Sequence, residues 1–268
     1  MRYVLVAASL TFGCKKVEPA PAELDALFHY VWDGYDAGED EVLHEAIRNL
    51  DAAVDGASVD GPADGSLTPL SDEQGALVGV TDRSPTAAAG VYLVNLIRCD
   101  LGALEQILTE PAQDQLYEGT YESYSRDYHG DIDGFLQGAD HTLSWDVTYT
   151  ASVLGAGYTA SLDSSLRRVV AMDDETSPWG DVMLARAYLP EPAEFDSDNK
   201  TLDQDYQLEA YWQRAPGEIV HAYAVWRQAD WGAGFTSDDD GIQRLMLNAL
   251  ADWDETTDEL CASGAYGG

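Results

Sequence analysis

The stretch that decides the fold is 142–153, which reads TLSWDVTYTASV from Thr142 to Val153. Its odd-numbered positions carry apolar or aromatic side chains, and the even-numbered positions between them carry Thr, Ser or Asp. Because successive side chains of a strand point to opposite faces of a sheet, this alternation predicts a strand with one buried face. A slip of one residue would expose the aromatic face to water, so the pattern also sets the register of the strand.

Similar patterns occur on both sides of this stretch. Strands are predicted at 91–98, 157–170, 181–189, 206–214 and 218–231. The connections between the later strands are short and carry Gly, Pro or Asp, which predicts antiparallel neighbours. The last predicted element is a strongly amphipathic helix over 242–260, whose apolar stripe requires a partner surface. The buried face of 142–153 and its neighbours is the surface that matches it.

Helices are predicted before the sheet. Apolar residues recur at helical spacing in 22–35 and 39–54, which predicts a helical hairpin. Shorter helices are predicted at 71–78, 101–108 and 114–128. The chain therefore divides into a signal peptide (1–13), a tether (14–21), the hairpin (22–55), a loop-rich linker (56–90), an antiparallel α+β domain (91–261) and a tail (262–268).

The first residues have the anatomy of a signal peptide. An apolar run from Tyr3 to Leu10 follows one Arg, and a small residue stands directly before a cysteine. The segment 10–14, LTFGC, resembles a bacterial lipobox. The resemblance implies export, lipidation of Cys14 and an anchor in the bacterial envelope. Lys15 after the cysteine resembles a signal for the outer membrane rather than the inner one, and simple secretion is the alternative to anchoring.

Two further cysteines remain, Cys99 and Cys261. In an exported protein such a pair is expected to form a disulfide, and two buried free thiols are the alternative. The bond would join the end of the strand at 91–98 to the end of the helix at 242–260.

The chain is strongly acidic, with 49 Asp and Glu residues against 14 Lys and Arg residues and a net charge of −35. Such a surface repels nucleic acid, which excludes this class of partner. It could instead bind Ca²⁺, because carboxylates at alternate positions can converge their oxygens on a hard cation. The candidate ligands are Asp196, Asp198, Asp203 and Asp205. A solvated acidic hairpin loop is the favoured interpretation of this segment, with Ca²⁺ binding as the alternative, and no other cofactor is indicated.

In 91–261, a strand, two short helices, a run of antiparallel strands and one long helix follow one another. This order resembles the helix-grip fold of the START and polyketide-cyclase-like superfamily. The resemblance implies an α+β fold in which a curved antiparallel sheet wraps the last helix, with an apolar cavity between them. A lipid-carrier-like half-barrel, its mouth plugged by the helices, is the alternative. The chain also resembles acidic lipoproteins of large-genome bacteria.

The residues expected to line such a cavity are Trp145, Val147, Tyr149, Tyr158, Trp212, Met246, Leu250 and Trp253. As a cavity lining they suit a lipid, a sterol or a flat aromatic ligand, and a filled core is the favoured interpretation of the aromatic residues among them. Arg167, Arg168 and Arg227 could place a positive charge near a pocket, as an acidic ligand would need, and pairing with nearby carboxylates is the favoured role.

The sequence contains no HExxH, CxxC or GxSxG motif, so it predicts no catalytic residue. We therefore expect a membrane-anchored, non-enzymatic module that binds a hydrophobic small molecule or an envelope partner. One alternative is a structural envelope lipoprotein with a filled core and no ligand. The other is a cyclase-like enzyme.

Overall fold

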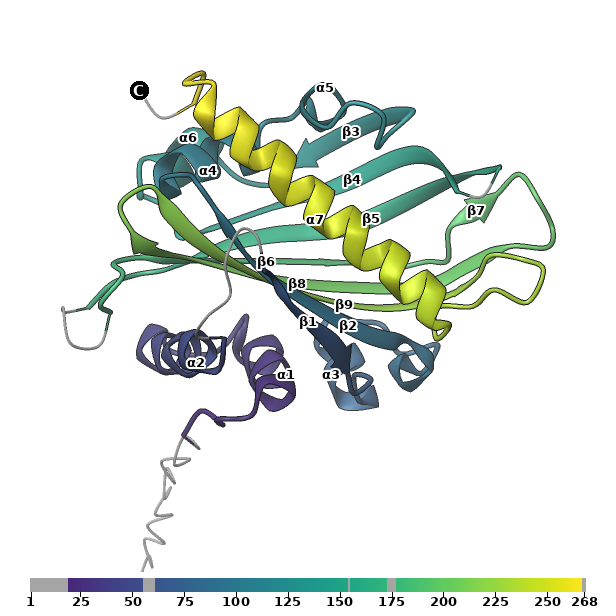
Figure 1. Ribbon diagram of the computed structural model, residues 1–268, viewed down its shortest axis with the longest axis horizontal. Helices are drawn as coiled ribbons and strands as arrows, with labels where there is room; N and C mark the ends of the chain where they lie inside the picture. The colour runs from purple at the N-terminus through teal and green to yellow at the C-terminus, as the bar shows by residue number, and fades with distance from the viewer. Residues whose placement is uncertain (1–18, 55–60, 154, 173–176, 267–268) are drawn as a thin grey trace, which may run out of the picture.

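The computed structural model of the protein describes residues 19–54, 61–153, 155–172 and 177–266. In this part the chain is α+β, as expected, and one curved antiparallel sheet separates two layers of helices (Figure 1). The helix α7 (Asp240–Ala262) crosses one face of the sheet, and the hairpin of α1 (Leu24–Gly34) and α2 (Asp40–Ala53) packs on the other. The predicted signal peptide and the lipidation site Cys14 lie outside the described residues.

The sheet contains nine described strands, each antiparallel to its neighbours. They are β1 (Ala63–Leu67), β2 (Ala89–Ile97), β3 (Ser123–Tyr128), β4 (Thr142–Val153), β5 (Ala156–Val169), β6 (Val182–Tyr188), β7 (Glu194–Phe195), β8 (Thr201–Ala215) and β9 (Glu218–Asp230). Their order across the sheet is β1-β2-β9-β8-β6-β5-β4-β3, and the short β7 pairs with β5. β1 and β3 are therefore the edges of the described sheet.

Short helices occupy the connections before β4. They are α3 (Asp72–Leu77), the 3₁₀ helix η1 (Pro85–Ala87), α4 (Leu101–Thr109), α5 (Gln113–Leu116) and α6 (Ile132–Leu136). Ser71 caps α3, because the Gln74 N–H donates to Ser71 Oγ and the Ser71 N–H donates to Gln74 Oε1. This capping box satisfies two N–H groups that the first helical turn leaves without partners.

The strand β4 has the predicted bounds and the predicted buried face. Its buried side chains are Leu143, Trp145, Val147, Tyr149 and Ala151. All five belong to the core beneath α7. The other predicted strands begin and end within five residues of β2, β5, β6, β8 and β9. Alternation of side chains across a pleated strand is thus a sufficient signal for most of the sheet.

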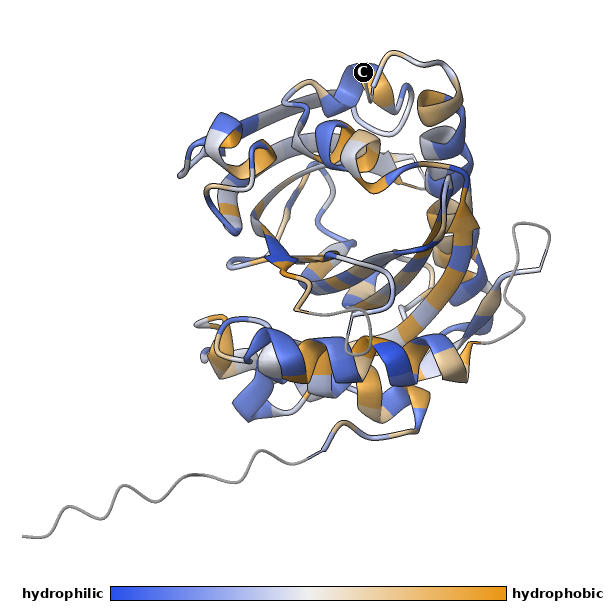
Figure 2. Ribbon diagram, turned by 90° about the vertical axis from the view of Figure 1, so that its left-hand side faces the viewer, coloured by the Kyte–Doolittle hydropathy of each residue, from blue (hydrophilic) through white to orange (hydrophobic). Residues whose placement is uncertain are grey.

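Two hydrophobic cores lie on opposite faces of the sheet. The hairpin-side core joins α1 and α2 to the outward faces of β8 and β9. In this core the ring of Trp32 meets Tyr206 and Trp226 edge-on, with centroids 6.0 and 5.8 Å away. The helix-side core joins α4 and α7 to the inward faces of β4 and β5. In Figure 2, orange apolar and blue polar residues alternate along the curved strands.

The predicted helix at 114–128 was wrong. α5 covers only the first three residues of this region, and the later part forms β3, which pairs with β4. Tyr124 and Tyr128 are four positions apart, a spacing that places side chains on one side of a helix and also on one face of a strand. Pairing with the edge of β4 decides between the two, because it satisfies backbone N–H and C=O groups along that edge.

The segment 56–90 is more than the loop-rich linker that composition predicts, because it contains β1, an edge strand paired with β2. Its sequence, ADGSL, has little apolar character. Glycine is needed in this strand, since a Cβ on Gly65 would lie 2.8 Å from Cε1 of Tyr92. Backbone pairing, rather than side-chain burial, therefore defines this strand.

The predicted disulfide between Cys99 and Cys261 is present, with the two Cα atoms 5.4 Å apart. Cys99 follows β2, and Cys261 lies in the last turn of α7. Beside the disulfide, Arg98 Nη2 lies 2.7 Å from Asp258 Oδ2 on α7. The C-terminal end of the helix is therefore fastened to the sheet by a covalent bond and an ion pair.

Candidate ligand-binding site

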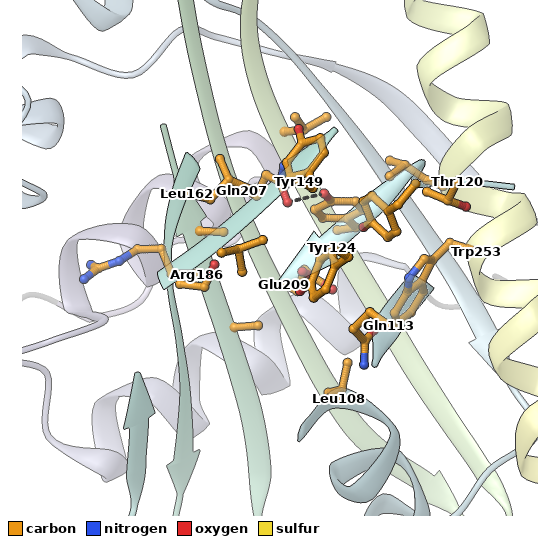
Figure 3. A pocket seen from close by; sticks show the side chains of 18 of the residues that line it. Leu108, Gln113, Thr120, Tyr124, Tyr149, Leu162, Arg186, Gln207, Glu209 and Trp253 are labelled. Carbon is orange, nitrogen blue, oxygen red and sulfur yellow. Dashed lines mark hydrogen bonds between the residues drawn. The ribbon is translucent and has the colours of Figure 1, made fainter. Parts of the chain in front are cut away.

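A cavity of about 360 Å³ lies between the inward face of the sheet and α7 (Figure 3). Side chains of β3, β4 and β5 line one side, and those of β6, β8 and β9 line its base. Side chains of α7, α5 and the end of α4 line the remaining side. Ligand sites in proteins commonly measure about 300–1,000 Å³. The cavity is therefore large enough to hold a small organic molecule.

The structure places seven of the eight predicted lining residues around this cavity. They are Trp145, Val147 and Tyr149 of β4, Tyr158 of β5, and Met246, Leu250 and Trp253 of α7. In Figure 3, Tyr149 and Trp253 lie on different sides of the same space. The face of β4 and the stripe of α7 thus face each other, and the space between them is incompletely filled.

Tyrosine side chains form much of the cavity wall. The ring of Tyr149 packs against those of Tyr121 and Tyr158, with centroids 5.4 and 5.9 Å away. Burial raises the pKa of Tyr149 well above its ordinary value, and burial also raises the pKa of Tyr121. Their hydroxyl groups are therefore neutral at physiological pH. The wall offers apolar ring faces together with uncharged hydrogen-bonding groups.

A chain of polar side chains crosses the base of the cavity. Arg227 of β9 lies 2.7 Å from Asp205 of β8, and Gln207 donates to the same carboxylate at 3.1 Å. Tyr223 donates to Gln207 Oε1 at 2.8 Å. Burial by itself would lower the pKa of Arg227, but the adjacent Asp205 carboxylate more than offsets this effect and raises that pKa. The charge of Arg227 is therefore already matched within the protein.

His221 of β9 is buried between two carboxylates. Its Nδ1 lies 2.7 Å from Asp254 Oδ1 on α7, and its Nε2 lies 3.2 Å from Glu209 Oε2 on β8. Its ring stacks on Tyr211 with centroids 4.3 Å apart. Burial by itself would lower the pKa of His221, but the carboxylates of Asp254 and Glu209 raise it to about 9. A protonated His221 therefore joins α7 to the sheet beside the cavity.

No family model matches this chain, and no curated protein matches it. Similar solved structures include the human StarD13 (DLC2) lipid transfer and protein localization domain, with 8% identity, coverage of 64% of this chain and 78% of that chain, and a TM-score of 0.40. A START superfamily protein from Mycobacterium smegmatis has 8% identity, coverage of 65% and 97%, and a TM-score of 0.41. The Zhui aromatase/cyclase from Streptomyces sp. R1128 has 9% identity, coverage of 64% of this chain and 92% of that chain, and a TM-score of 0.35.

The architecture is of the helix-grip type. This assignment rests on the strand order and on the course of α7 along the sheet, which also distinguish it from a half-barrel plugged at its mouth. The similarities to solved structures concern the fold, and at TM-scores below 0.5 they carry no argument about function.

Trp212 lies on the opposite face of this helix-grip sheet, so its prediction as a cavity residue was wrong. Its side chain is fully buried against the hairpin, and its Nε1 donates to Asp51 Oδ1 of α2 at 2.8 Å. The even-numbered side chains in the middle of β8 are its apolar ones, and the hairpin covers them. The odd-numbered Gln207 and Glu209 between them are polar and line the cavity.

Sequence reasoning misses the cluster of Glu209, His221 and Asp254 because its members come from three elements. A usable signal is present in β8, where polar side chains alternate with apolar ones. That alternation identifies one polar face, but it does not identify which layer covers the face. Either the helical hairpin or α7 could cover the apolar face of β8, and the sequence alone does not indicate which of them does.

The four aspartates predicted to bind Ca²⁺ do not form a metal site. Asp205 is paired with Arg227 inside the sheet, and Asp203 accepts a hydrogen bond from a threonine of its own strand. Asp196 and Asp198 lie in the connection before β8. Across the described ranges, no three side chains of His, Cys, Asp and Glu converge to hold a metal ion. The Ca²⁺ prediction was wrong because the strand separates Asp205 from the loop carboxylates.

The adjacent arginines of β5 serve opposite faces of the sheet. Arg167 Nη2 lies 2.8 Å from Asp40 of the hairpin, and Arg168 Nη2 lies 2.7 Å from Glu105 of α4. Each therefore fastens one helical layer to the sheet, and carboxylate pairing is their role. Arg227 also pairs with a carboxylate, but unlike them it lines the cavity.

Proposed function

We propose that this protein binds a hydrophobic small molecule in the cavity between the sheet and α7. The observation that carries the proposal is a space of about 360 Å³ between two faces whose patterns match. Protein interiors are normally packed to the density of organic crystals, and voids larger than a water molecule are few. A structural protein with a filled core has no need of such a space, whereas a binding protein does.

The lining favours a flat or ring-containing ligand. Trp145, Tyr149 and Trp253 offer ring faces and edges, and aromatic pairs prefer offset-stacked or edge-on arrangements. Val147 and Leu250 add apolar surface from β4 and α7. Transfer of apolar ligand surface into this lining is worth roughly 25 cal/mol per Å², which makes the area buried the main source of affinity. A concave cavity of this size favours a small molecule over a protein partner.

The test is a fluorescence titration with N-phenyl-1-naphthylamine, an uncharged aromatic dye. We expect saturable binding to the purified protein and loss of that binding in Leu250→Trp, because the larger ring would fill the cavity. Ala52→Trp, at an exposed position of α2 on the other side of the sheet, is the matched control and should bind as wild type does. Absence of saturable binding, or binding that Leu250→Trp leaves unchanged, would contradict the proposal.

We propose further that the protein is exported and held at the bacterial envelope, at the outer membrane, by a lipid on Cys14. The support is the apolar run that ends in Gly13–Cys14. In the part of the chain that the structure describes, no helix is long and apolar enough to cross a membrane. Cys14→Ser should move the protein from the membrane fraction to the soluble exported fraction, and Lys16→Gln should not. A wild-type protein that is soluble after lysis would refute the anchor.

A further inference from the structure

Arg126 occupies an unusual position at the β3 side of the cavity. It pairs in register with Val147 of β4, which directs its side chain inward, and it belongs to the cavity lining. Its guanidinium carbon lies 4.7 Å from the ring centroid of Trp145 and 5.4 Å from that of Tyr124. The cation is therefore surrounded by aromatic rings, whose faces attract it but do not neutralise it.

The partners of Arg126 are all uncharged. Its Nε donates to the Tyr124 hydroxyl at 2.6 Å, and its Nη1 donates to the Tyr128 hydroxyl at 3.2 Å and to the Leu108 carbonyl. Among the described residues no carboxylate lies within ion-pair distance of it, and its Nη2 has no hydrogen-bond partner. The contrast with the other two arginines of the cavity lining is direct, because Arg227 is paired with Asp205 and Arg186 is paired with Asp36.

Two further donors beside Arg126, on Trp145 and Tyr124, have no acceptor in the described structure, whereas the hydroxyl of Tyr128 donates to the Thr109 carbonyl at 2.7 Å. The Nε1 of Trp145 is buried and has no partner in the described structure. The Tyr124 hydroxyl accepts from Arg126 and donates to no described residue, and burial raises its pKa, so it keeps its proton. A buried donor without an acceptor, like a buried charge without a partner, is destabilising. What these donors and the cation lack is a negatively charged oxygen group that would accept their hydrogen bonds.

Resting on the proposed function, we infer that the molecule bound in the cavity is an acid, a hydrophobic body with a carboxylate that Arg126 binds at the β3 side. A carboxylate would accept a hydrogen bond from Nη2 of Arg126, and the hydroxyl of Tyr124 beside it could donate a second one. Charged hydrogen bonds in a site shielded from water are stronger than neutral ones. Selection of an acid in a chain of net charge −35 must then come from this local site, because the overall field repels anions.

The experiment compares 1-pyrenebutanoic acid with its uncharged methyl ester, which have the same ring system. Both are titrated against the purified protein at about pH 7.5, where the acid is ionised, and at about 0.15 M salt, which screens the surface charges. We expect wild type to bind the acid more tightly than the ester by on the order of tenfold or more. Arg126→Gln should remove most of this preference and leave the affinity for the ester within about twofold.

Two further variants give the comparison its controls. Arg126→Lys keeps the charge but not the planar fork, so it should retain part of the preference for the acid. Arg244→Gln removes a positive charge from the exposed face of α7 and should leave both affinities unchanged. Equal binding of acid and ester by wild type would overturn the inference, even if Arg126→Gln failed to fold.

The outcomes separate this inference from the proposed function. If the ester binds, Leu250→Trp abolishes its binding and the acid has no advantage, the cavity is a ligand site without an acid subsite. If the acid preference survives in Arg126→Gln, the group that selects the acid is not Arg126 and the assignment is wrong. If neither probe binds, the proposed function fails and the acid subsite fails with it.

Discussion

The cluster of His221, Asp254 and Glu209 should make the stability of the protein depend on pH. The pKa of His221 rises from an ordinary value of 6.5 to about 9 in the folded protein. A group with a raised folded pKa stabilises the protein fully below its unfolded value, and this stabilisation is lost as the pH rises through the folded value. The difference corresponds to on the order of 3 kcal/mol in the free energy of unfolding.

The measurement is urea unfolding from about pH 6.5 to about pH 9.5, and the free energy of unfolding should fall by most of that amount across this range. The range ends there because Tyr211 and Tyr223 pack against the ring of His221. Burial raises the pKa of both tyrosines well above the ordinary value. Their own contribution to stability is lost only as the pH rises beyond about 10.

Asp254→Asn tests the physical cause. It leaves His221 with Glu209 as its remaining carboxylate, so the pKa of His221 should fall and the loss of stability should occur at lower pH. Removal of one partner of a buried pair is also expected to lower the free energy of unfolding by about 3–5 kcal/mol near neutral pH. Asp252→Asn, at an exposed position of the same helix, should keep the wild-type profile. A wild-type stability that is constant over this range, or an unchanged slope in Asp254→Asn, would refute the reasoning.

Three further predictions follow from the two cores and the disulfide. Leu250→Ala at the cavity should lower the free energy of unfolding by less than about 2 kcal/mol in a urea titration. Leu104→Ala in the fully buried part of α4 should lower it by about 2–5 kcal/mol in the same titration. Equal losses in the two variants would contradict an incompletely filled cavity. Cys99→Ser opens a loop of 162 residues and should lower the stability by up to about 5 kcal/mol, and a melting temperature equal to that of the unreduced wild type would contradict this. Asp51→Ala removes both the acceptor of Trp212 Nε1 and the ion-pair partner of Arg214, and it should lower the stability by about 1–3 kcal/mol. The exposed Glu41→Ala should change the stability little, and equal effects of the two variants would argue against these hairpin-side contacts.

The parts of the fold that sequence analysis predicted correctly are those with a strong local period. The alternation in 142–153 and the stripe in 242–260 each specify an element and its buried face without reference to the rest of the chain. The predicted disulfide is confirmed because only two cysteines remain after Cys14. The edge strands β1 and β3 were missed for the opposite reason, since pairing of their backbones with a neighbour defines them.

The candidate site also has a part that the sequence predicted and a part that it did not. Its aromatic and apolar walls come from the two periodic elements, so Trp145, Tyr149 and Trp253 were predictable. The cluster around His221 and the position of Arg126 were not, because each depends on segments that are distant in the sequence. Arg126 in particular occurs in a segment whose tyrosine spacing fits a helix as well as a strand.

By itself, then, the sequence determined the strands and helices that have a strong period, together with the apolar face of β4 and of α7. Backbone geometry imposes these periods on any chain that carries the pattern. Only the tertiary structure decided that the hairpin covers the apolar face of β8 while α7 covers that of β4, leaving Arg126 and the polar face of β8 beside the cavity. The physical reason is that hydrophobic burial is non-directional. An apolar face therefore specifies that it will be buried, but it does not specify which element of the chain will cover it.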